Sequence, residues 1–366
     1  MTKREQQILA LIQADPLITQ NDIAQAVGIS RSAVAGHIMK LTAQGIVKGR
    51  GYVFNDSPYI AVIGGANMDI HGAPEIKLRL RDSNPGTVST SPGGVARNIA
   101  ENIARLGVDC RLISAVGNDQ YGQMLLQQGR DAGIDMRHVA LLDSAPTSTY
   151  MSVLDHAGDM HVAISDMTVI DALDSERLRS HEKMLRQATL IVLDTNLCDD
   201  ALAWLANNFA DKPLFVDTVS TTKALKIKPY LASVHTLKPS LIEAESIAGV
   251  KAGTRKQMKT LANWFHEKGV QRLFITLGNR GVFYSTQEQQ GSIKPPAHQP
   301  RLKNAGGAGD AFLAGAAFSW LKDWPLDKSM QFGLAAASIA LSHEKTSNPN
   351  LSLAAINQVI EKYHAN

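Results

Sequence analysis

Cysteine is scarce in this sequence: Cys110 and Cys198 are the two cysteines among 366 residues. They lie far apart, and neither belongs to a CxxC pair or a His-rich segment, so the sequence offers neither a disulfide framework nor a zinc site. We interpret both as core residues. Apolar runs of membrane-spanning length are also lacking, and the first fifteen residues alternate polar and apolar types at helical spacing instead of forming a leader. A soluble, cytoplasmic protein is expected.

Two common nucleotide-binding motifs are missing as well. No GxxxxGK[ST] sequence occurs anywhere, and neither GGANMD (64–69) nor GGAGDAF (306–312) completes GxGxxG. Their absence disfavours a P-loop enzyme and a dinucleotide-dependent dehydrogenase.

What the sequence does contain is enough apolar material for two domains, since 44% of 366 residues are hydrophobic. The net charge is +3, and its distribution is uneven. Residues 1–50 hold six Lys or Arg against three acids, which leaves 31 charges of each sign in the remainder. A basic segment ahead of a neutral body indicates that this segment approaches a polyanion.

The N-terminal segment shows the periodicity of three short helices. Gly28 makes a turn after the second, and Ser30 is a suitable N-cap for a third helix through Val34, Ile38 and Leu41. This pattern predicts a helix-turn-helix over residues 1–55, with Gly49 to Phe54 as a truncated wing, and it resembles the winged helix-turn-helix units of bacterial regulators. The residues expected to contact DNA are Arg31, Ser32, His37 and Lys40. The alternative is a unit that packs on the rest of the chain or mediates dimerisation.

After residue 58 apolar strands alternate with helical patterns, which predicts an α/β domain over 58–366 with a mostly parallel sheet. Strands are expected at 59–70, 110–115, 190–194, 214–217, 236–238 and 273–277. The polar, β-prone segments near 72–90 and 147–164 do not fit this alternation, and we expect them to form a small separate sheet, a lid over a site.

The most informative local sequence is NAGGAGDAFLAG, in which Gly306, Gly307 and Gly309 precede Asp310 and an apolar helical pattern. Backbone amides of Gly307, Ala308 and Gly309 at a helix N-terminus can form an anion hole, and a Cβ would hold a phosphate away from them. A carboxylate there is explained if Asp310 accepts a proton from an attacking hydroxyl. The alternative is an ordinary N-terminal charge that complements the helix dipole.

The GAGDAFLAG segment resembles the C-terminal signature of the ribokinase-like (PfkB-type) kinases. SPGGVARNIAENIARLG resembles that family's glycine-pair motif, and GGANMDIHG contains its Asn-x-Asp. The resemblance implies a ribokinase-like fold, ATP-dependent phosphorylation, Asp310 as the catalytic base, and a substrate site. The substrate-binding residues are Asn67, Asp69, Gly93, Gly94 and Asn98.

On the nucleotide side, FITLGNRGVFY resembles the family's ATP-binding strand and turn, which implies ATP contacts from Thr276, Gly278 and Gly281. A hairpin turn would show the same glycines. LKPSLIEAE matches the Asn-x-x-Glu motif that organises hydrated Mg²⁺, with Glu243 as the metal residue. Ser240 stands where the family has Asn, and Gly306 where many relatives carry a side chain. Mg²⁺ and ATP are the implied cofactors, with a monovalent cation such as K⁺ as a further candidate.

Longer segments of the catalytic region resemble pseudouridine kinases, which implies that the 5′-hydroxyl of this nucleoside is the acceptor. Ser152 and Asp166 of the lid are then candidates to meet the base. The alternatives are another nucleoside (inosine-type), a free sugar (ribose- or fructose-type), or a metabolite-sensing transcription regulator with a kinase-like sensor. The expected partners are therefore a small nucleoside or sugar and operator DNA at residues 1–55; whether the chain forms a homodimer is left open.

Overall fold

The computed structural model describes residues 1–48, 58–156, 160–296 and 306–364. They form two compact units, one of Met1–Pro58 with Glu182–Gln187, the other of Tyr59–His181 and Ala188–Asn366. The expected wing, Gly49 to Phe54, lies outside the described residues.

The first unit contains the three expected helices, α1 (Lys3–Ala14), α2 (Gln20–Val27) and α3 (Arg31–Ala43). Gly28 ends α2 with a φ of +67°, a conformation that glycine adopts without strain. The Ser30 hydroxyl accepts a hydrogen bond from the Ala33 amide and so caps α3 as expected. The apolar stripes meet in one small core of Ile8, Ile12, Ile23, Val34, Ile38, Leu41 and Val47.

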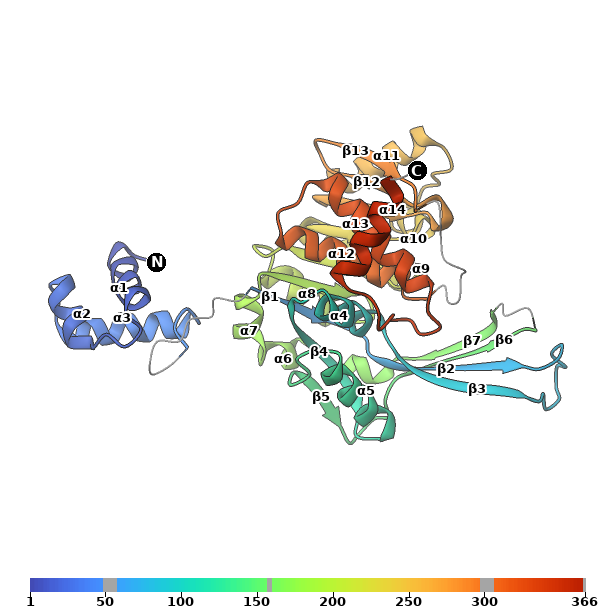
Figure 1. Cartoon of the computed structure of the whole chain (residues 1–366), viewed down its shortest axis with the longest axis horizontal. Coiled ribbons are helices and arrows are strands. Elements are labelled where there is room, and N and C mark those ends of the chain that lie inside the picture. Colours follow the sequence, from blue (N-terminus) through green and yellow to red (C-terminus); the bar gives the residue numbers. More distant parts are fainter. Residues whose placement is uncertain (49–57, 157–159, 297–305, 365–366) are drawn as a thin grey trace. The chain divides into compact units, whose positions relative to one another are not determined.

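The second unit is built on a nine-stranded sheet with the order β13-β12-β11-β10-β9-β8-β1-β4-β5 (Figure 1). Neighbours from β11 to β5 are parallel, and β12 and β13 add antiparallel at one edge. The mostly parallel sheet expected from the sequence is thus present. Its strands are β1 (Tyr59–Ile63), β4 (Asp109–Gly117), β5 (Val139–Leu142), β8 (Leu190–Asp194), β9 (Leu214–Asp217), β10 (Thr236–Lys238), β11 (Arg272–Thr276), β12 (Val282–Ser285) and β13 (Gln290–Ile293).

The central strands are buried along their whole length because helices cover the sheet, as parallel sheets require. One group of helices, α4, α12, α13 and α14, packs together in a layer (Figure 1). The helices of the chain after residue 58 are α4 (Val95–Arg105), α5 (Gln120–Asp131), α6 (Ser175–Arg179), α7 (Glu182–Gln187), α8 (Asp199–Asn208), α9 (Thr221–Ala224), α10 (Leu241–Ala248), α11 (Arg255–Glu267), α12 (Ala308–Leu321), α13 (Leu326–Leu341), α14 (Leu353–His364) and the 3₁₀ helices η1 (Thr168–Ala172), η2 (Leu225–Ser233) and η3 (Gly278–Arg280).

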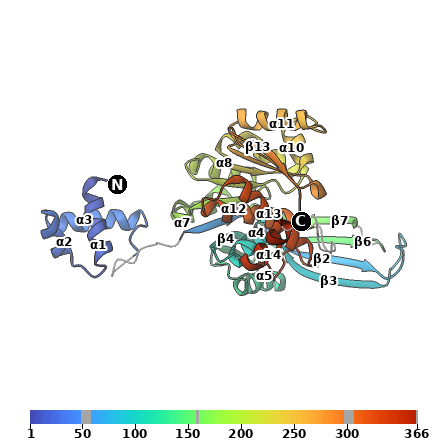
Figure 2. The same ribbon diagram turned by 45° about the horizontal axis from the view of Figure 1, so that its top comes forward.

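A second, four-stranded sheet with the order β3-β2-β6-β7 forms the lid. Its strands leave the helix-covered body as extended ribbons in both ribbon views (Figures 1 and 2). The expected segments 72–90 and 147–164 need correction, because the lid already begins at residue 67 and ends at 166, and residues 75–85 only connect two strands. The strands are β2 (Asn67–Pro74), β3 (Gly86–Gly93), β6 (Thr149–Leu154) and β7 (Met160–Asp166).

The two cysteines, both expected in the core, differ in their burial. Cys110 is a buried core residue, but Cys198 is only partly buried, at the N-terminus of α8, so its assignment to the core was wrong. Both thiols are free. Within the described ranges no helix is long and apolar enough to cross a membrane.

Candidate active site

Four neighbouring parallel strands end in polar side chains at the same edge of the large sheet. Strand β8 ends at Asp194, β9 at Asp217, β10 at Lys238 and β11 at Thr276. The first three of these side chains are buried. Open α/β sheets bind their ligands at the carboxyl ends of the strands, so this edge marks the candidate site.

Helix α12 begins at Ala308, with Gly307 as an N-cap that has no capping side chain. The first amides of a helix have no acceptor within the helix, and its dipole favours an anion there. Gly307 has a further, structural reason to be glycine, because its φ is +80° and a Cβ would overlap the Thr346 carbonyl oxygen. A Cβ on Gly309 would lie 2.7 Å from Lys238 Nζ, the end of a flexible side chain that can move aside. The role of these glycines in making room for a phosphate stays a prediction.

The Lys238 ammonium group lies beside this helix terminus, and the motifs had not identified it. Its Nζ is 2.6 Å from Asp217 Oδ2, and the side chain is buried. Burial alone would lower the pKa of Lys238, but the carboxylates of Asp217, Asp310 and Glu243 outweigh it and raise the pKa. Lys238 is therefore charged and adds a fixed positive charge to the anion site. The sequence feature that could have identified Lys238 is a lysine at the end of a buried strand, TLK (Thr236–Lys238).

The Asp310 carboxyl group faces this charged cluster from the first turn of α12. It is buried, and its Oδ2 accepts a hydrogen bond of 2.9 Å from Asn98 Nδ2. Burial, reinforced by the charge of Asp217, raises the pKa of Asp310 to about 7, while Lys238 and the Asn98 hydrogen bond oppose the rise. A carboxylate with this pKa can take up a proton near neutral pH, as a general base must.

The Asn98 amide is held in one orientation. Its Oδ1 accepts hydrogen bonds from Arg97 Nη1 at 3.1 Å and from the hydroxyls of Thr346 and Ser347 at 3.3 Å each. Arg97 is in turn paired with the buried carboxylate of Glu101. With three donors on its oxygen, Asn98 must direct its NH₂ group toward Asp310. One of its two N–H bonds serves Asp310. Substrate binding by Asn98 stays a prediction.

Asn67 and Asp69 lie together on β2, where they form one polar pair. Asn67 Nδ2 donates to Asp69 Oδ1 at 2.7 Å, and both side chains are buried. A Cβ on Gly93 would overlap the Asp69 carboxylate, and one on Gly94, whose φ is +97°, would come within 2.6 Å of the Ala66 Cα. Gly93 thus allows β3 to pack against Asp69, and Gly94 allows the start of α4 to pack against the turn before β2. Burial raises the pKa of Asp69, against the effects of Asn67, His71 and Arg97.

Asp194 joins the segments that carry these residues and was also missed by the motifs. Its Oδ2 accepts hydrogen bonds of 2.9 Å from the amides of Gly65 and Ala96, and its Oδ1 accepts one of 2.9 Å from the Asn196 amide. One buried carboxylate therefore holds the β1–β2 turn against the start of α4.

The proposed ATP-binding residues lie in and before a hairpin turn. Gly278 and Gly281, with φ values of +62° and +89°, form the turn between the antiparallel strands β11 and β12. A Cβ on Gly281 would overlap the Ile293 carbonyl oxygen, so the hairpin itself requires these glycines. Thr276 ends β11, and its amide donates a hydrogen bond of 2.9 Å to the Pro239 carbonyl oxygen. Pro239 directly follows Lys238, the last residue of the neighbouring strand β10. The ATP contacts of all three remain a prediction.

Glu243 and Ser240 together cap helix α10. The Ser240 amide donates to Glu243 Oε2 at 2.8 Å, the Ser240 hydroxyl accepts from the Glu243 amide, and Thr218 Oγ1 donates to Glu243 Oε2 at 2.7 Å. Ser240 thus does the work of an N-cap in place of Asn. In the parts of the chain that the structure describes, no three His, Cys, Asp or Glu side chains are grouped to hold a metal ion. Glu243 as a metal residue stays a prediction.

The residues proposed for DNA binding lie on α3. Arg31, Ser32 and Lys40 are exposed, whereas His37 is partly buried, with its Nδ1 3.6 Å from the Glu5 Oε1 atom of α1. His37 is therefore shared between the surface of α3 and the packing of the unit.

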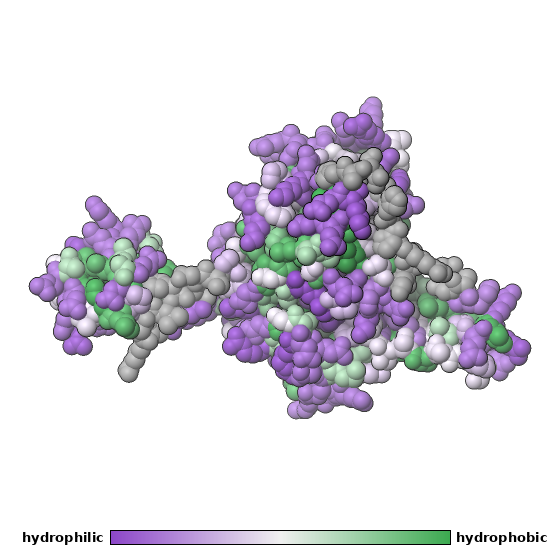
Figure 3. Space-filling view, viewed as in Figure 1, coloured by the Kyte–Doolittle hydropathy of each residue, from purple (hydrophilic) through white to green (hydrophobic). Residues whose placement is uncertain are grey.

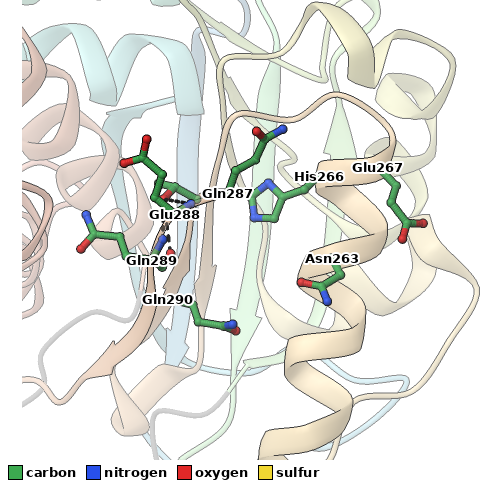
Figure 4. A pocket seen from close by; sticks show the side chains of 8 residues that line it. Asn263, His266, Glu267, Gln287, Glu288, Gln289 and Gln290 are labelled. Atoms are coloured by element: carbon green, nitrogen blue, oxygen red, sulfur yellow. Dashed lines mark hydrogen bonds between the residues drawn. The ribbon is translucent and has the colours of Figure 1, made fainter.

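A polar cavity of 390 Å³ lies apart from all of these residues (Figure 4). It is lined by Asn263, His266 and Glu267 of α11 and by residues 286–290 of the turn between β12 and β13. The His266 nitrogens lie 2.7 Å from the Val270 carbonyl oxygen and 2.8 Å from Ser285 Oγ, so the imidazole is fully engaged. None of the expected catalytic or substrate residues reaches this cavity, and we do not assign it to the reaction.

The profile of the pfkB family carbohydrate kinases matches residues 57–353, and that of a winged helix-turn-helix DNA-binding family matches residues 1–48. The chain is 40% identical over 353 residues to the uncharacterized sugar kinase YeiI of Escherichia coli, covering 96% of this chain and 97% of that one. It is also 40% identical over 306 residues to the pseudouridine kinase of Escherichia coli (84% and 97%), and 26% identical over 295 residues to the guanosine-inosine kinase of Exiguobacterium acetylicum (80% and 97%).

Solved structures have the same fold. A protein from Clostridium perfringens described as a sugar kinase superposes with a TM-score of 0.74 at 33% identity, over 84% of this chain and 97% of that one. A protein from E. coli described as ribokinase II, in complex with ATP and Mg²⁺, gives 0.72 at 18% identity, over 83% and 99%. The second likeness supports the fold alone. Because the family profile matches most of its length, the chain belongs to the pfkB family of carbohydrate kinases, and it is an ATP-dependent kinase with an N-terminal winged helix-turn-helix region.

Proposed function

We propose that this chain, acting in the cytoplasm, transfers the γ-phosphoryl group of ATP to the 5′-hydroxyl of a nucleoside, with pseudouridine as the preferred acceptor. The observation that carries the proposal is the placement of Asp310, with a pKa raised to about 7 by burial, at the uncapped N-terminus of α12 beside the Lys238 ammonium group. Phosphoryl transfer to an alcohol needs a base that lies next to an anion site.

In the proposed reaction Asp310 accepts the proton of the substrate hydroxyl as the oxygen attacks the γ-phosphorus in line. The amides of Gly307, Ala308 and Gly309 and the Lys238 ammonium group stabilise the charge on the transferring group. Asn98 holds Asp310 in place through Nδ2, and Asn67 and Asp69 bind the ribose hydroxyls, because an amide and a carboxylate together can pair with a vicinal diol.

Mg²⁺ is proposed to bind between the nucleotide phosphates and Glu243, where it would neutralise phosphate charge. The oxygen donors at this edge suit a hard cation that keeps several waters, and Glu243 lies near enough to Lys238 to affect its pKa. A monovalent cation such as K⁺ is proposed as a further cofactor; the Thr346 carbonyl, packed against Gly307, is an oxygen of the type it would use. Replacing KCl by choline chloride tests this, and an unchanged rate would remove K⁺ from the proposal.

The preference for pseudouridine is supported by the 40% identity to a pseudouridine kinase over 84% of the chain. An inosine-type nucleoside and a free sugar of the ribose or fructose type are the alternative acceptors, since the fold hosts all of them.

Purified protein incubated with ATP, Mg²⁺ and each of pseudouridine, uridine, inosine, ribose and fructose tests the proposal, with phosphorylated product measured by mass spectrometry. Pseudouridine is expected to give the highest kcat/KM. A higher value for a free sugar would contradict the nucleoside assignment. Binding of one of these compounds without any product would instead favour a metabolite-sensing regulator.

We also propose that residues 1–55 form a DNA-binding domain ahead of a kinase domain at 58–366. The match to a winged helix-turn-helix family supports this, as do the exposed Arg31, Ser32 and Lys40 on α3.

Because phosphate contacts release counterions, affinity for operator DNA should fall steeply between 50 and 200 mM salt, by about tenfold or more. Fluorescence anisotropy measures it, with Arg31→Ala/Lys40→Ala as the weakened variant and Lys251→Ala, an exposed lysine of the other unit, as the matched control. Salt-independent binding, or no binding, would contradict the DNA-binding proposal and favour the alternative that residues 1–55 pack on the rest of the chain.

A homodimer formed through the lid is the third proposal. Alternate residues of β3, β6 and β7 place Val88, Met151, Val162 and Ile164 on one face of the lid, where they are 45% to 75% exposed. Hydrophobic atoms are visible on the lid strands in Figure 3. An apolar patch of this kind is complementary to its own copy, which a twofold interface requires. Analytical ultracentrifugation is expected to give a dimer for the native chain and a monomer for Val162→Lys; a monomer for both would contradict it.

A further inference from the structure

The lid contains a polar pair on the face opposite its exposed apolar side. His71 on β2 and Ser152 on β6 are register partners, and His71 Nδ1 lies 2.6 Å from Ser152 Oγ. Ser152 is buried, and His71 is partly buried. The pair therefore joins two lid strands by a side-chain hydrogen bond. Ser152 is one of the two lid residues expected to meet the base, whereas no role is yet assigned to His71.

The strand register places this pair on the substrate face. Side chains alternate along a strand, so His71 lies on the same face of β2 as Asp69, two residues away, and Ser152 lies on the same face of β6 as Tyr150, which is the partner of Asp69. Two residues of a strand span about 7 Å. A nucleoside whose ribose is bound at Asp69 can therefore extend its base toward His71 and Ser152.

The second nitrogen of His71 supplies the chemical argument. Among the described residues His71 Nε2 is buried and has no hydrogen-bond partner. A buried polar atom without a partner is energetically costly, so native proteins rarely leave one unless a ligand or water completes it. The Ser152 hydroxyl can either donate to Nδ1 or accept from it, and so Nε2 can either donate or accept.

Asp166, the other lid residue expected to meet the base, is engaged elsewhere. Its Oδ1 accepts hydrogen bonds from the Thr168 amide at 3.1 Å and from Thr168 Oγ1 at 2.7 Å, which makes it the cap of a local turn. Its register partner is Thr149, one residue out of phase with Tyr150 and Ser152, so it belongs to the opposite face of the lid.

We propose that His71, held by Ser152, is a specificity-determining residue that hydrogen-bonds the polar edge of the nucleobase through Nε2. This inference rests on the proposed nucleoside kinase function. The ligand group it fits is a carbonyl or N–H of a pyrimidine-type base, because a ring nitrogen whose donor or acceptor role depends on the tautomer can pair with either group. A free sugar would leave it unpaired.

The test compares kcat/KM for pseudouridine, uridine and inosine at saturating ATP and Mg²⁺, in the full chain and in the variants His71→Phe and Ser152→Ala. In both variants the ratio of kcat/KM between the best and the worst nucleoside should be about tenfold smaller than in the native chain. This is the effect of one lost hydrogen bond in a buried site. Ser152→Ala removes only one hydroxyl group, so it still tests the proposal if His71→Phe does not fold. Thr90→Val, on the apolar face of the same sheet, is the matched control and should leave the ratio unchanged.

Each other outcome is decisive. If both variants lower kcat/KM for all three nucleosides by the same factor, the pair only supports the lid and the inference is wrong. A native chain that accepts the three nucleosides equally would also overturn it, because there is then no base selectivity to explain. A native chain that phosphorylates free sugars and no nucleoside would refute the proposed function itself, a result distinct from the other two.

Discussion

A single carboxyl group, that of Asp310, shares a buried space with the Asp217 carboxylate, the Lys238 ammonium group and the amide of Asn98. Burial and Asp217 favour its neutral form, and Lys238 and Asn98 favour its charged form. The balance is suited to a base that must be ionised before the substrate hydroxyl attacks the phosphorus and protonated afterwards.

The rate should follow the ionisation of Asp310. Only the ionised form accepts a proton, and because its pKa is raised to about 7, kcat/KM should increase about tenfold per pH unit below that value and become level above it. Initial rates from pH 5.5 to 9 measure this, with ATP affinity determined at each pH as the control. A profile that is flat between pH 5.5 and 7 would contradict the assignment.

Loss of the Lys238 charge should shift that profile. Lys238 lowers the pKa of Asp310, so Lys238→Met should move the ascending limb to higher pH, and it should also lower kcat because a positive charge is lost from the anion site. Lys238→Arg keeps the charge and serves as the control. An unshifted limb in Lys238→Met would show that the ammonium group does not act on Asp310.

The residues of the site were only partly predictable from the sequence. The GAGD loop indicated Asp310 because glycines next to an acid before a helix are unusual. Asp194, Asp217 and Lys238 went unnoticed, since each comes at the end of a short apolar run whose neighbours in space are distant in sequence. The packing of Gly307 against the Thr346 carbonyl was also missed, because that contact depends on the tertiary fold.

At the scale of elements, the substrate side depends on how β2 and α4 are held together. Asp194, at the end of β8, accepts hydrogen bonds from the Gly65 amide before β2 and from the Ala96 amide of α4. The positions of Asp69 and Asn98 relative to Asp310 therefore depend on a residue that is expected to contact neither substrate.

Asp194→Asn should weaken this connection. The new NH₂ group cannot accept from both amides, and an unpaired buried amide costs about 1 to 3 kcal/mol, so the free energy of unfolding should fall by roughly that amount. The KM for the nucleoside should rise more than the KM for ATP, because the displaced segments carry the sugar-binding residues. Urea denaturation and steady-state kinetics measure both. Asp200→Asn, an exposed acid that accepts from the Ser175 amide, is the control, and equal stability in the two variants would refute this role.

Strands were easier to predict than the lid. The buried parallel strands β8, β9 and β10 have the limits expected from their apolar runs, because burial on both faces leaves a continuous hydrophobic signal. The start of the lid was misplaced by five residues, because YIAVIGGANMDI was expected to form one strand over 59–70. The pairing that makes Asn67 the first residue of a separate strand comes from β3, about twenty-five residues away.

At the scale of the whole molecule, a small helical unit and a large α/β unit have separate cores. The uneven charge had indicated this division, and the two family matches fall on either side of residue 57. Composition could not indicate whether one unit affects the other, because such coupling depends on contacts that sequence patterns do not encode.

The kinase unit should therefore work without residues 1–55. All residues proposed for phosphoryl transfer lie after residue 58, so a chain of residues 56–366 should retain kcat and both KM values within about twofold, while DNA binding is lost. Kinetics and anisotropy on the shortened and full chains measure the two effects. A large loss of kcat in a shortened chain that is still folded, as judged by circular dichroism, would show that the units depend on each other.

The central claim is that Asp310 is the base, and Asp310→Asn tests it most directly. The amide keeps the size of the side chain but cannot take the proton, so kcat with ATP, Mg²⁺ and pseudouridine should fall by about 10²- to 10⁴-fold. Calorimetric Kd values for ATP and pseudouridine should stay within about threefold of the native values. The substitution also removes a buried carboxyl group whose folded pKa is raised, so stability at pH 8 should increase. A variant with near-native kcat would contradict the account.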